Sequence, residues 1–111
     1  MDDEHARELL TGERLRIERL LHEATEAARQ DRIAANESGD IADPAEPLTA
    51  QEMDDAVIAG LRDRLGAIER AETRLREGTF GRSIASGQAI PDERLEADPA
   101  AELTVEEASE G

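Results

Sequence analysis

Two rows of apolar side chains repeat every seven residues near the start of the chain: Leu10, Ile17 and Ala24 in one row, Leu20 and Ala27 in the other. The positions between them are mostly charged, so the apolar face is a narrow seam. A narrow seam is typical of a coiled coil rather than of a helix in a globular core. The pattern predicts one long helix over residues 3–35, whose alanine-rich end buries the smaller area.

A polar segment with two prolines interrupts this pattern, and we predict a turn over residues 36–48. Thr49 is the preferred start of the next helix, because Glu52 three residues later completes a capping box. A competing start has Asp43 as the N-cap. That start would place Pro47 in the first full turn, where proline removes a backbone donor.

A second amphipathic helix is predicted over residues 50–77. Apolar residues keep steps of three or four along it: Met53, Val57, Leu61, Leu65, Ile68 and Leu75. Gly78 follows directly and is a typical C-cap residue. Two long helices joined by a turn predict an antiparallel helical hairpin over residues 1–77, with its tip at 36–48.

The remaining residues have a different character. Glycines and prolines separate short apolar pieces, which predicts a small, loop-rich lobe over 78–107 with a short β-hairpin and a last helical turn. A piece this small rarely folds alone, so we expect it to pack on the open end of the hairpin through Phe80, Ile84, Ile90 and Leu95. Residues 108–111 are expected to fray.

The chain is strongly acidic. Its 111 residues include 28 acidic residues against 13 arginines and no lysine, a net charge of −15. Such a chain repels phosphate backbones, which disfavours direct binding of DNA or RNA. No apolar run is long enough to cross a membrane and no signal peptide opens the chain, so we expect a cytoplasmic protein.

Patterns that would support catalysis or metal binding are weak. There is no Cys, which excludes thiolate sites. His22 and Glu26 have i, i+4 spacing, but two ligands on a helix surface do not make a metal site. Ser83 and Ser86 have no nearby His or Lys to act as a base. We therefore predict a protein with no enzymatic activity, no cofactor and no metal.

Acidic residues gather around the predicted turn at Asp40, Asp43 and Glu46, followed by Asp54 and Asp55. The simplest interpretation of these acids is a solvated loop that caps a helix. The alternative is an acidic probe held far from the body by a stiff stalk. Calcium binding is a third possibility, but the Asp-x-x-Asp spacing does not match an EF-hand loop.

Two short motifs share one ungapped register. The first comprises Ile68-Glu69, Gly78, Phe80-Gly81, Gly87, Ile90, Arg94-Leu95, Ala97 and Pro99. The second is Asp-x-x-Asp-x-Ala at Asp40, Asp43 and Ala45. Together they strongly resemble the signature and tip motif of the DksA/TraR family of bacterial RNA polymerase-binding regulators. The resemblance covers about residues 5–107, and two motifs in one register are more specific than either alone.

The resemblance implies a mainly α fold: a long antiparallel helical hairpin with a small zinc-finger-like C-terminal lobe. It also implies a protein that binds RNA polymerase through the secondary channel. Asp40, Asp43 and Ala45 would then lie at the tip that modulates transcription initiation. We expect a monomer whose partner is the polymerase and not the promoter DNA.

Several positions of this sequence depart from the family pattern, and they change what the resemblance implies. The four zinc-ligand positions of the family are occupied here by Ser83, Ser86, Thr104 and Glu107, which implies a degenerate lobe without zinc. Basic side chains that help hold guanosine tetraphosphate in longer members correspond to Ala67, Asp98 and Ala108. We therefore expect this nucleotide not to be a ligand.

Two other functions compete with a DksA-like regulator. One is a structural or scaffold hairpin that binds another protein and has no transcriptional role. The other is a secondary-channel cleavage factor that positions magnesium with its tip acids. Co-purification with RNA polymerase core tests the first, and stimulated cleavage of backtracked RNA tests the second.

Overall fold

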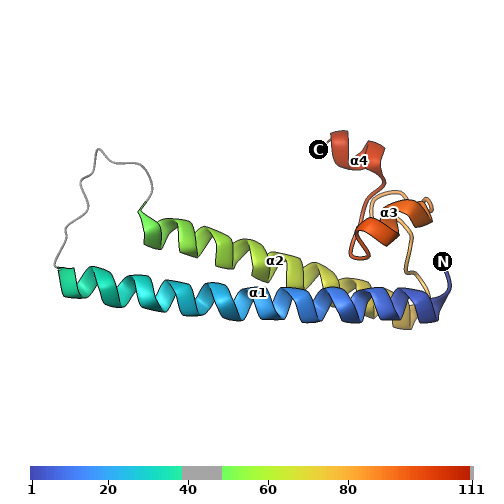
Figure 1. Ribbon diagram of the computed structural model, residues 1–111. Helices are drawn as coiled ribbons and strands as arrows, with labels where there is room; N and C mark the ends of the chain where they lie inside the picture. The colour runs from blue at the N-terminus through green and yellow to red at the C-terminus, as the bar shows by residue number, and fades with distance from the viewer. Residues whose placement is uncertain (39–48, 111) are drawn as a thin grey trace.

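The structure is a computed structural model that describes residues 1–38 and 49–110. Within these residues the chain forms helices α1 (Asp3–Ser38), α2 (Ala50–Glu77), α3 (Asp92–Ala97) and α4 (Val105–Glu110). The first two run antiparallel, and the last two belong to a lobe beside the end of the hairpin where the chain begins (Figure 1). The molecule is elongated, about 54 × 29 × 20 Å. The predicted fold class, a mainly helical hairpin with a small C-terminal lobe, is confirmed.

Both ends of α2 are fixed by the caps that the sequence predicts. Thr49 Oγ1 accepts a hydrogen bond from the Glu52 N–H at 3.1 Å, and the Thr49 N–H donates to the Glu52 carboxylate at 3.0 Å. At the other end Gly78 adopts the left-handed conformation with φ 82°, which glycine tolerates without a Cβ clash. Helix α1 ends at Ser38 and not at residue 35, so the start of the predicted turn is helical.

The seam between α1 and α2 follows the predicted rows at first and then departs from them. The core contains Leu10 and Ile17, both nearly fully buried. Further along, Ala28 is buried while the predicted Ala27 is exposed. In a straight α-helix, positions seven residues apart differ in direction by about 20°. Ala28 therefore lies nearer to the face of Ile17 than a strict heptad repeat predicts.

The part of α2 near Thr49 buries less than the pattern predicts. Met53 is 56% exposed and Val57 is 54% exposed, so their expected place in the seam is wrong. The buried residues of α2 lie in its second half, at Ile68, Ala71 and Leu75. The late part of α1 is rich in alanine, and short side chains reach too little of the facing helix to cover these residues.

The lobe packs on the hairpin through two linked clusters. Ala100 joins the hairpin core, whereas Ile90, Leu95 and Ala101 form a second cluster. Phe80 packs against both clusters, as expected for the one aromatic residue of the chain. The expectation for Ile84 is wrong, since this side chain is 61% exposed.

Short elements complete the lobe. The expected β-hairpin is a single antiparallel bridge between Arg82 and Ala89. Helix α3 was not predicted, although Pro91 followed by two acids is a typical helix start. Residues 108–110, which we expected to fray, belong to α4. No helix in the described part of the chain is long and apolar enough to cross a membrane.

Candidate functional site

The sequence singles out two candidate sites, the predicted tip motif and the four degenerate zinc-ligand positions of the lobe. The predicted tip residues Asp40, Asp43 and Ala45 fall outside the described residues. The helix ends that flank them, Ser38 and Ala50, lie at the end away from the lobe (Figure 1).

Negative charge is crowded on the helices next to this far end. A hydrogen bond with Asp31 of α1 raises the pKa of Asp54 of α2, and burial and the nearby Asp55 act in the same direction. One carboxylate oxygen of Asp54 is buried without a hydrogen-bond partner. Two carboxyl groups that face each other across the hairpin make this region an acidic surface even without the tip residues.

The four positions that correspond to zinc ligands come together in the lobe. The Glu107 carboxylate accepts hydrogen bonds from the Ser86 hydroxyl, the Thr104 backbone N–H and the Ser83 hydroxyl, and these bonds lower its pKa to about 2. Ser83 and Thr104 are each only 5% exposed. The structure thus places the four side chains in one hydrogen-bonded cluster, which we call the Glu107 cluster.

The chemistry of the Glu107 cluster does not fit zinc. Structural zinc sites use thiolate and imidazole ligands, whereas this cluster offers three hydroxyls and one carboxylate. The Thr104 hydroxyl also accepts the Glu107 N–H at 3.2 Å, while the Ser83 hydroxyl accepts from Ala85 and Ser86. These oxygens are engaged with one another and with the backbone, so they do not form a set of free metal ligands.

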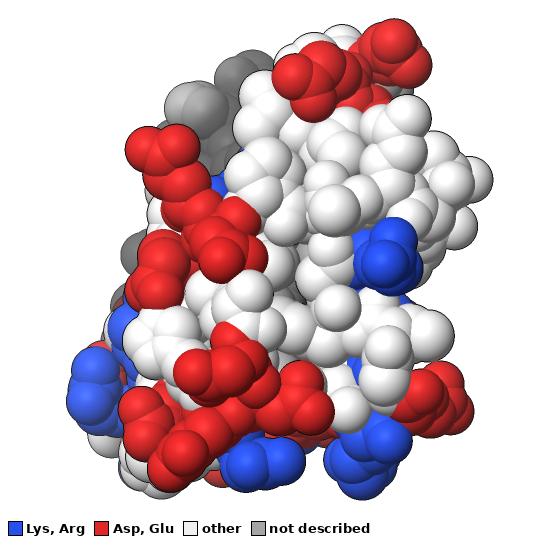
Figure 2. Space-filling view, turned by 90° about the vertical axis from the view of Figure 1, so that its right-hand side faces the viewer, with Lys and Arg blue, Asp and Glu red and all other residues white. Residues whose placement is uncertain are grey.

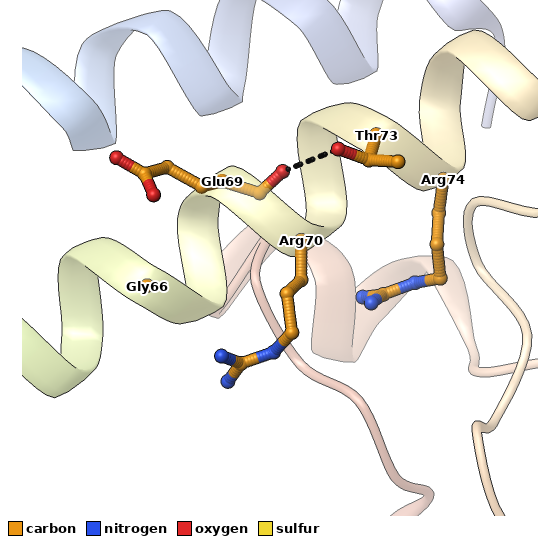
Figure 3. A pocket seen from close by; sticks show the side chains of 5 residues that line it. All are labelled: Gly66, Glu69, Arg70, Thr73 and Arg74. Carbon is orange, nitrogen blue, oxygen red and sulfur yellow. Dashed lines mark hydrogen bonds between the residues drawn. The ribbon is translucent and has the colours of Figure 1, made fainter.

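Arginines of α2 hold the lobe against the hairpin. Arg70 makes a two-pronged contact with Glu102, at 3.0 and 2.9 Å, and Arg74 reaches the same carboxylate at 3.4 Å. Figure 3 shows both side chains leaving α2 on the same side, along a shallow groove of about 450 Å³ that Gly66, Glu69 and Thr73 also line. A bidentate guanidinium–carboxylate contact fixes direction as well as distance.

Further ion pairs connect the same elements. Arg64 of α2 bonds Asp98 of the lobe and also approaches Glu13 of α1. Arg14 joins α1 to α2 through Glu72. Sequence reasoning did not identify these clamps. The signal was the arginine surplus of residues 56–82, which carry six arginines and four acids between two acidic segments.

The clamps predict a pH dependence of stability. Hydrogen bonding to Arg14 lowers the pKa of Glu72 below its ordinary value of 4.5. A lowered folded-state pKa stabilises the fold above the unfolded value, and that contribution is lost as the pH falls through the folded value. At neutral pH, Glu72→Gln is expected to be less stable than the parent by at most about 1 kcal/mol, because the pair is partly exposed.

This difference is expected to shrink as the pH falls from about 6 to 3, because protonation then removes the same charge from the parent. Urea unfolding of both proteins across this range measures it. A difference that stays constant or grows toward pH 3 would contradict the assignment of the Glu72–Arg14 pair.

One part of the face at the lobe end is uncharged, although the chain has a net charge of −15. Figure 2 looks onto this end and shows a white area in its upper right part, with acidic side chains above it and to its left and both acidic and basic side chains below it. The lobe segment 83–91 carries no charged residue, and most of it is exposed. The lobe therefore carries an uncharged patch over 83–91, although it is acidic as a whole, with seven acids and two arginines in residues 78–107.

Comparison with known proteins supports this architecture. No family model matches the chain. General stress protein 16O of Bacillus subtilis is 34% identical over 98 residues, which are 87% of this chain and 56% of that protein. The chain thus spans about half the length of this curated relative.

A solved structure shares the shape of nearly the whole chain. The structure of transcription factor DksA2 from Pseudomonas aeruginosa superposes with a TM-score of 0.73 and covers 97% of this chain and 81% of that one. The two sequences are 18% identical, so the likeness concerns the fold. The long paired helices and the lobe at their open end are therefore those of a DksA-like fold.

Proposed function

We propose that this protein is a DksA-like transcription regulator that binds RNA polymerase through the secondary channel and modulates initiation with its acidic tip. The observation that carries the proposal is the separation of two surfaces along a molecule about 54 Å long. A lobe with an uncharged patch over 83–91 stands at one end, and the ends of α1 and α2 that flank the Asp43 segment stand at the other (Figure 1). The shared fold of a transcription factor supports this role.

The charge distribution agrees with a protein partner. Residues 37–55 carry seven acids and no arginine. Such a segment is repelled by nucleic acid but is suited to basic protein surfaces and to metal ions held by another protein. An acidic segment that avoids nucleic acid and suits a basic protein surface agrees with a regulator that binds a protein and not DNA. We assign this protein no enzymatic activity.

Binding to the polymerase is tested first. The tagged full chain is expected to retain RNA polymerase core from a mixture of purified proteins and to alter run-off transcription. Retention without any change in transcription would favour the scaffold alternative. No retention would overturn the proposal. Stimulated cleavage of backtracked RNA would favour the cleavage-factor alternative.

The direction of insertion can be tested separately because the chain has no Cys. Asn36→Cys and Thr11→Cys each introduce one thiol at an exposed position of α1, the first near the tip and the second near the lobe. With an iron chelate on the thiol, Asn36→Cys is expected to cut the polymerase close to its active site and Thr11→Cys is not. The same cuts from both variants would contradict the proposed orientation.

Guanosine tetraphosphate is expected not to enhance the effect of this protein on transcription. An anionic ligand needs cations, and Asp98 has the wrong sign where the family has a base. In the structure the Asp98 carboxylate also accepts a hydrogen bond from the Arg64 guanidinium. A transcription assay with and without the nucleotide measures this, using a polymerase whose own separate site is disabled. Clear synergy would refute the expectation.

A further inference from the structure

We propose that the Glu107 cluster closes the lobe, with one carboxylate taking the central place that a metal ion has in the zinc-containing family. The cluster joins two segments of the lobe, 83–86 and 104–107. The proposal concerns the folding of the lobe and does not depend on which partner the protein binds.

The first segment is a turn built around the Ser83 hydroxyl. This oxygen accepts the N–H groups of Ala85 at 3.1 Å and Ser86 at 3.2 Å. The Ser83 backbone is tied to the same turn, because its carbonyl accepts the Gly87 N–H at 2.9 Å. The turn therefore directs the Ser83 and Ser86 hydroxyls to one side, where both donate to Glu107.

The second segment is the start of α4. The Thr104 N–H donates to the Glu107 carboxylate at 2.9 Å, and the Glu107 N–H donates to the Thr104 hydroxyl at 3.2 Å. This reciprocal pair is a capping box, so the carboxylate is already held in place by its own helix. The two serine hydroxyls then bind a carboxylate whose position is fixed.

The backbone of the first segment also binds the chain just before the second, since the Ile84 N–H donates to the Glu102 carbonyl at 2.9 Å. The cluster buries Ser83 and Thr104, and buried hydroxyls are costly unless they are hydrogen-bonded. Among the described residues, the buried side-chain atoms without a partner lie elsewhere, on Asp54 and Arg74. The buried hydroxyls of Ser83 and Thr104 therefore each have a partner, as a stable polar network requires.

A closure of this kind uses hydroxyl, carboxylate and backbone N–H groups and no thiolate. Hydroxyl and carboxylate groups are not oxidised as thiolates are, and a chelator has nothing to remove from them. The melting temperature of the parent protein is expected to be the same with and without a strong chelator. A fall on adding chelator, or one equivalent of zinc in the purified protein, would overturn the proposal.

Glu107→Ala tests the centre of the cluster, with Glu106→Ala as its control. Both substitutions remove one acid from the first turn of α4, but Glu106 is exposed and has no part in the cluster. Glu107→Ala is expected to lower the melting temperature by about 5 °C. It is also expected to speed amide hydrogen exchange at residues 83–88 about tenfold or more. Equal behaviour of the two variants would show that apolar packing alone closes the lobe.

Ser86→Ala is a milder variant if Glu107→Ala fails to fold. It removes one donor and is expected to cause a smaller shift in the same direction. Where both folded single variants are available, adding Ser86→Ala to Glu107→Ala is expected to change nothing further, because the two groups act through one bond. Fully additive effects would contradict the coupling.

Whether the four positions meet at one point can be tested by replacing all four residues with cysteine. The variant Ser83→Cys, Ser86→Cys, Thr104→Cys and Glu107→Cys is expected to bind one zinc ion, because four thiolates at one point form a tetrahedral site. Zinc titration of this variant under reducing conditions measures the stoichiometry. Absence of zinc binding in a folded variant would show that the four positions do not converge.

Discussion

Asp43→Asn is expected to abolish most of the effect on transcription while leaving binding to RNA polymerase largely intact. The hairpin and the lobe offer most of the surface available to a partner, so one tip charge contributes little affinity. The charge itself is what the proposed mechanism uses near the active site. Run-off transcription and a polymerase-binding assay on the same preparation separate the two effects.

Asparagine is chosen because it distinguishes the mechanism from a simple helix cap. Asn caps helices about as well as Asp, so the variant is nearly silent if Asp43 is only a cap. Regulation equal to that of the parent would therefore remove the support for a tip mechanism and favour a scaffold. Circular dichroism checks that the hairpin is retained.

Ala45→Thr tests the steric side of the same mechanism. The family motif has a small residue here, and an added branch is expected to clash where the tip passes close to another surface. The variant is expected to lose regulation as Asp43→Asn does. Unchanged regulation in the run-off assay would contradict a close approach of the tip.

Ile68→Ala is expected to lower the free energy of unfolding by about 3 kcal/mol. Ile68 is fully buried at the centre of the core that joins both helices and Ala100 of the lobe. Truncation removes the buried methyl groups and leaves a cavity. Small proteins are stabilised by only about 5–15 kcal/mol, so this loss is a large fraction of the total.

Val57→Ala on the same helix is the matched control. This valine is 54% exposed, and its truncation is expected to change the free energy by about 0.5 kcal/mol or less. Urea unfolding followed by circular dichroism measures both variants. Equal losses would mean that the half of α2 near Thr49 is packed as tightly as the half near Leu75.

The sequence was sufficient for the helical hairpin because its signals are local. Heptad spacing, the Thr49–Glu52 box and Gly78 each act within a few residues, and the structure confirms all three cap residues. The extent of burial was harder to predict. Whether Met53 is covered depends on which side chains the other helix presents, and that depends on how the two helices drift against each other.

The lobe shows where local patterns were insufficient. We expected apolar packing alone to compensate for the missing cysteines, whereas the structure adds a polar cluster around Glu107. Its capping box, Thr104 with Glu107, was present in the sequence. The serines that complete it come from about 20 residues earlier, so their contact with Glu107 depends on the fold of the lobe. The tip residues remain a prediction from the motif.

The uneven packing of the hairpin has a mechanical consequence. Large buried side chains such as Leu10 and Leu75 join the helices near the lobe, whereas the seam farther out relies on Ala28. The free energy of local opening therefore falls from the lobe toward the far end. The two helices are held together more firmly near the lobe than near Ala28. The helices around Ala28 are therefore expected to separate more often than the helices around Leu10 and Leu75.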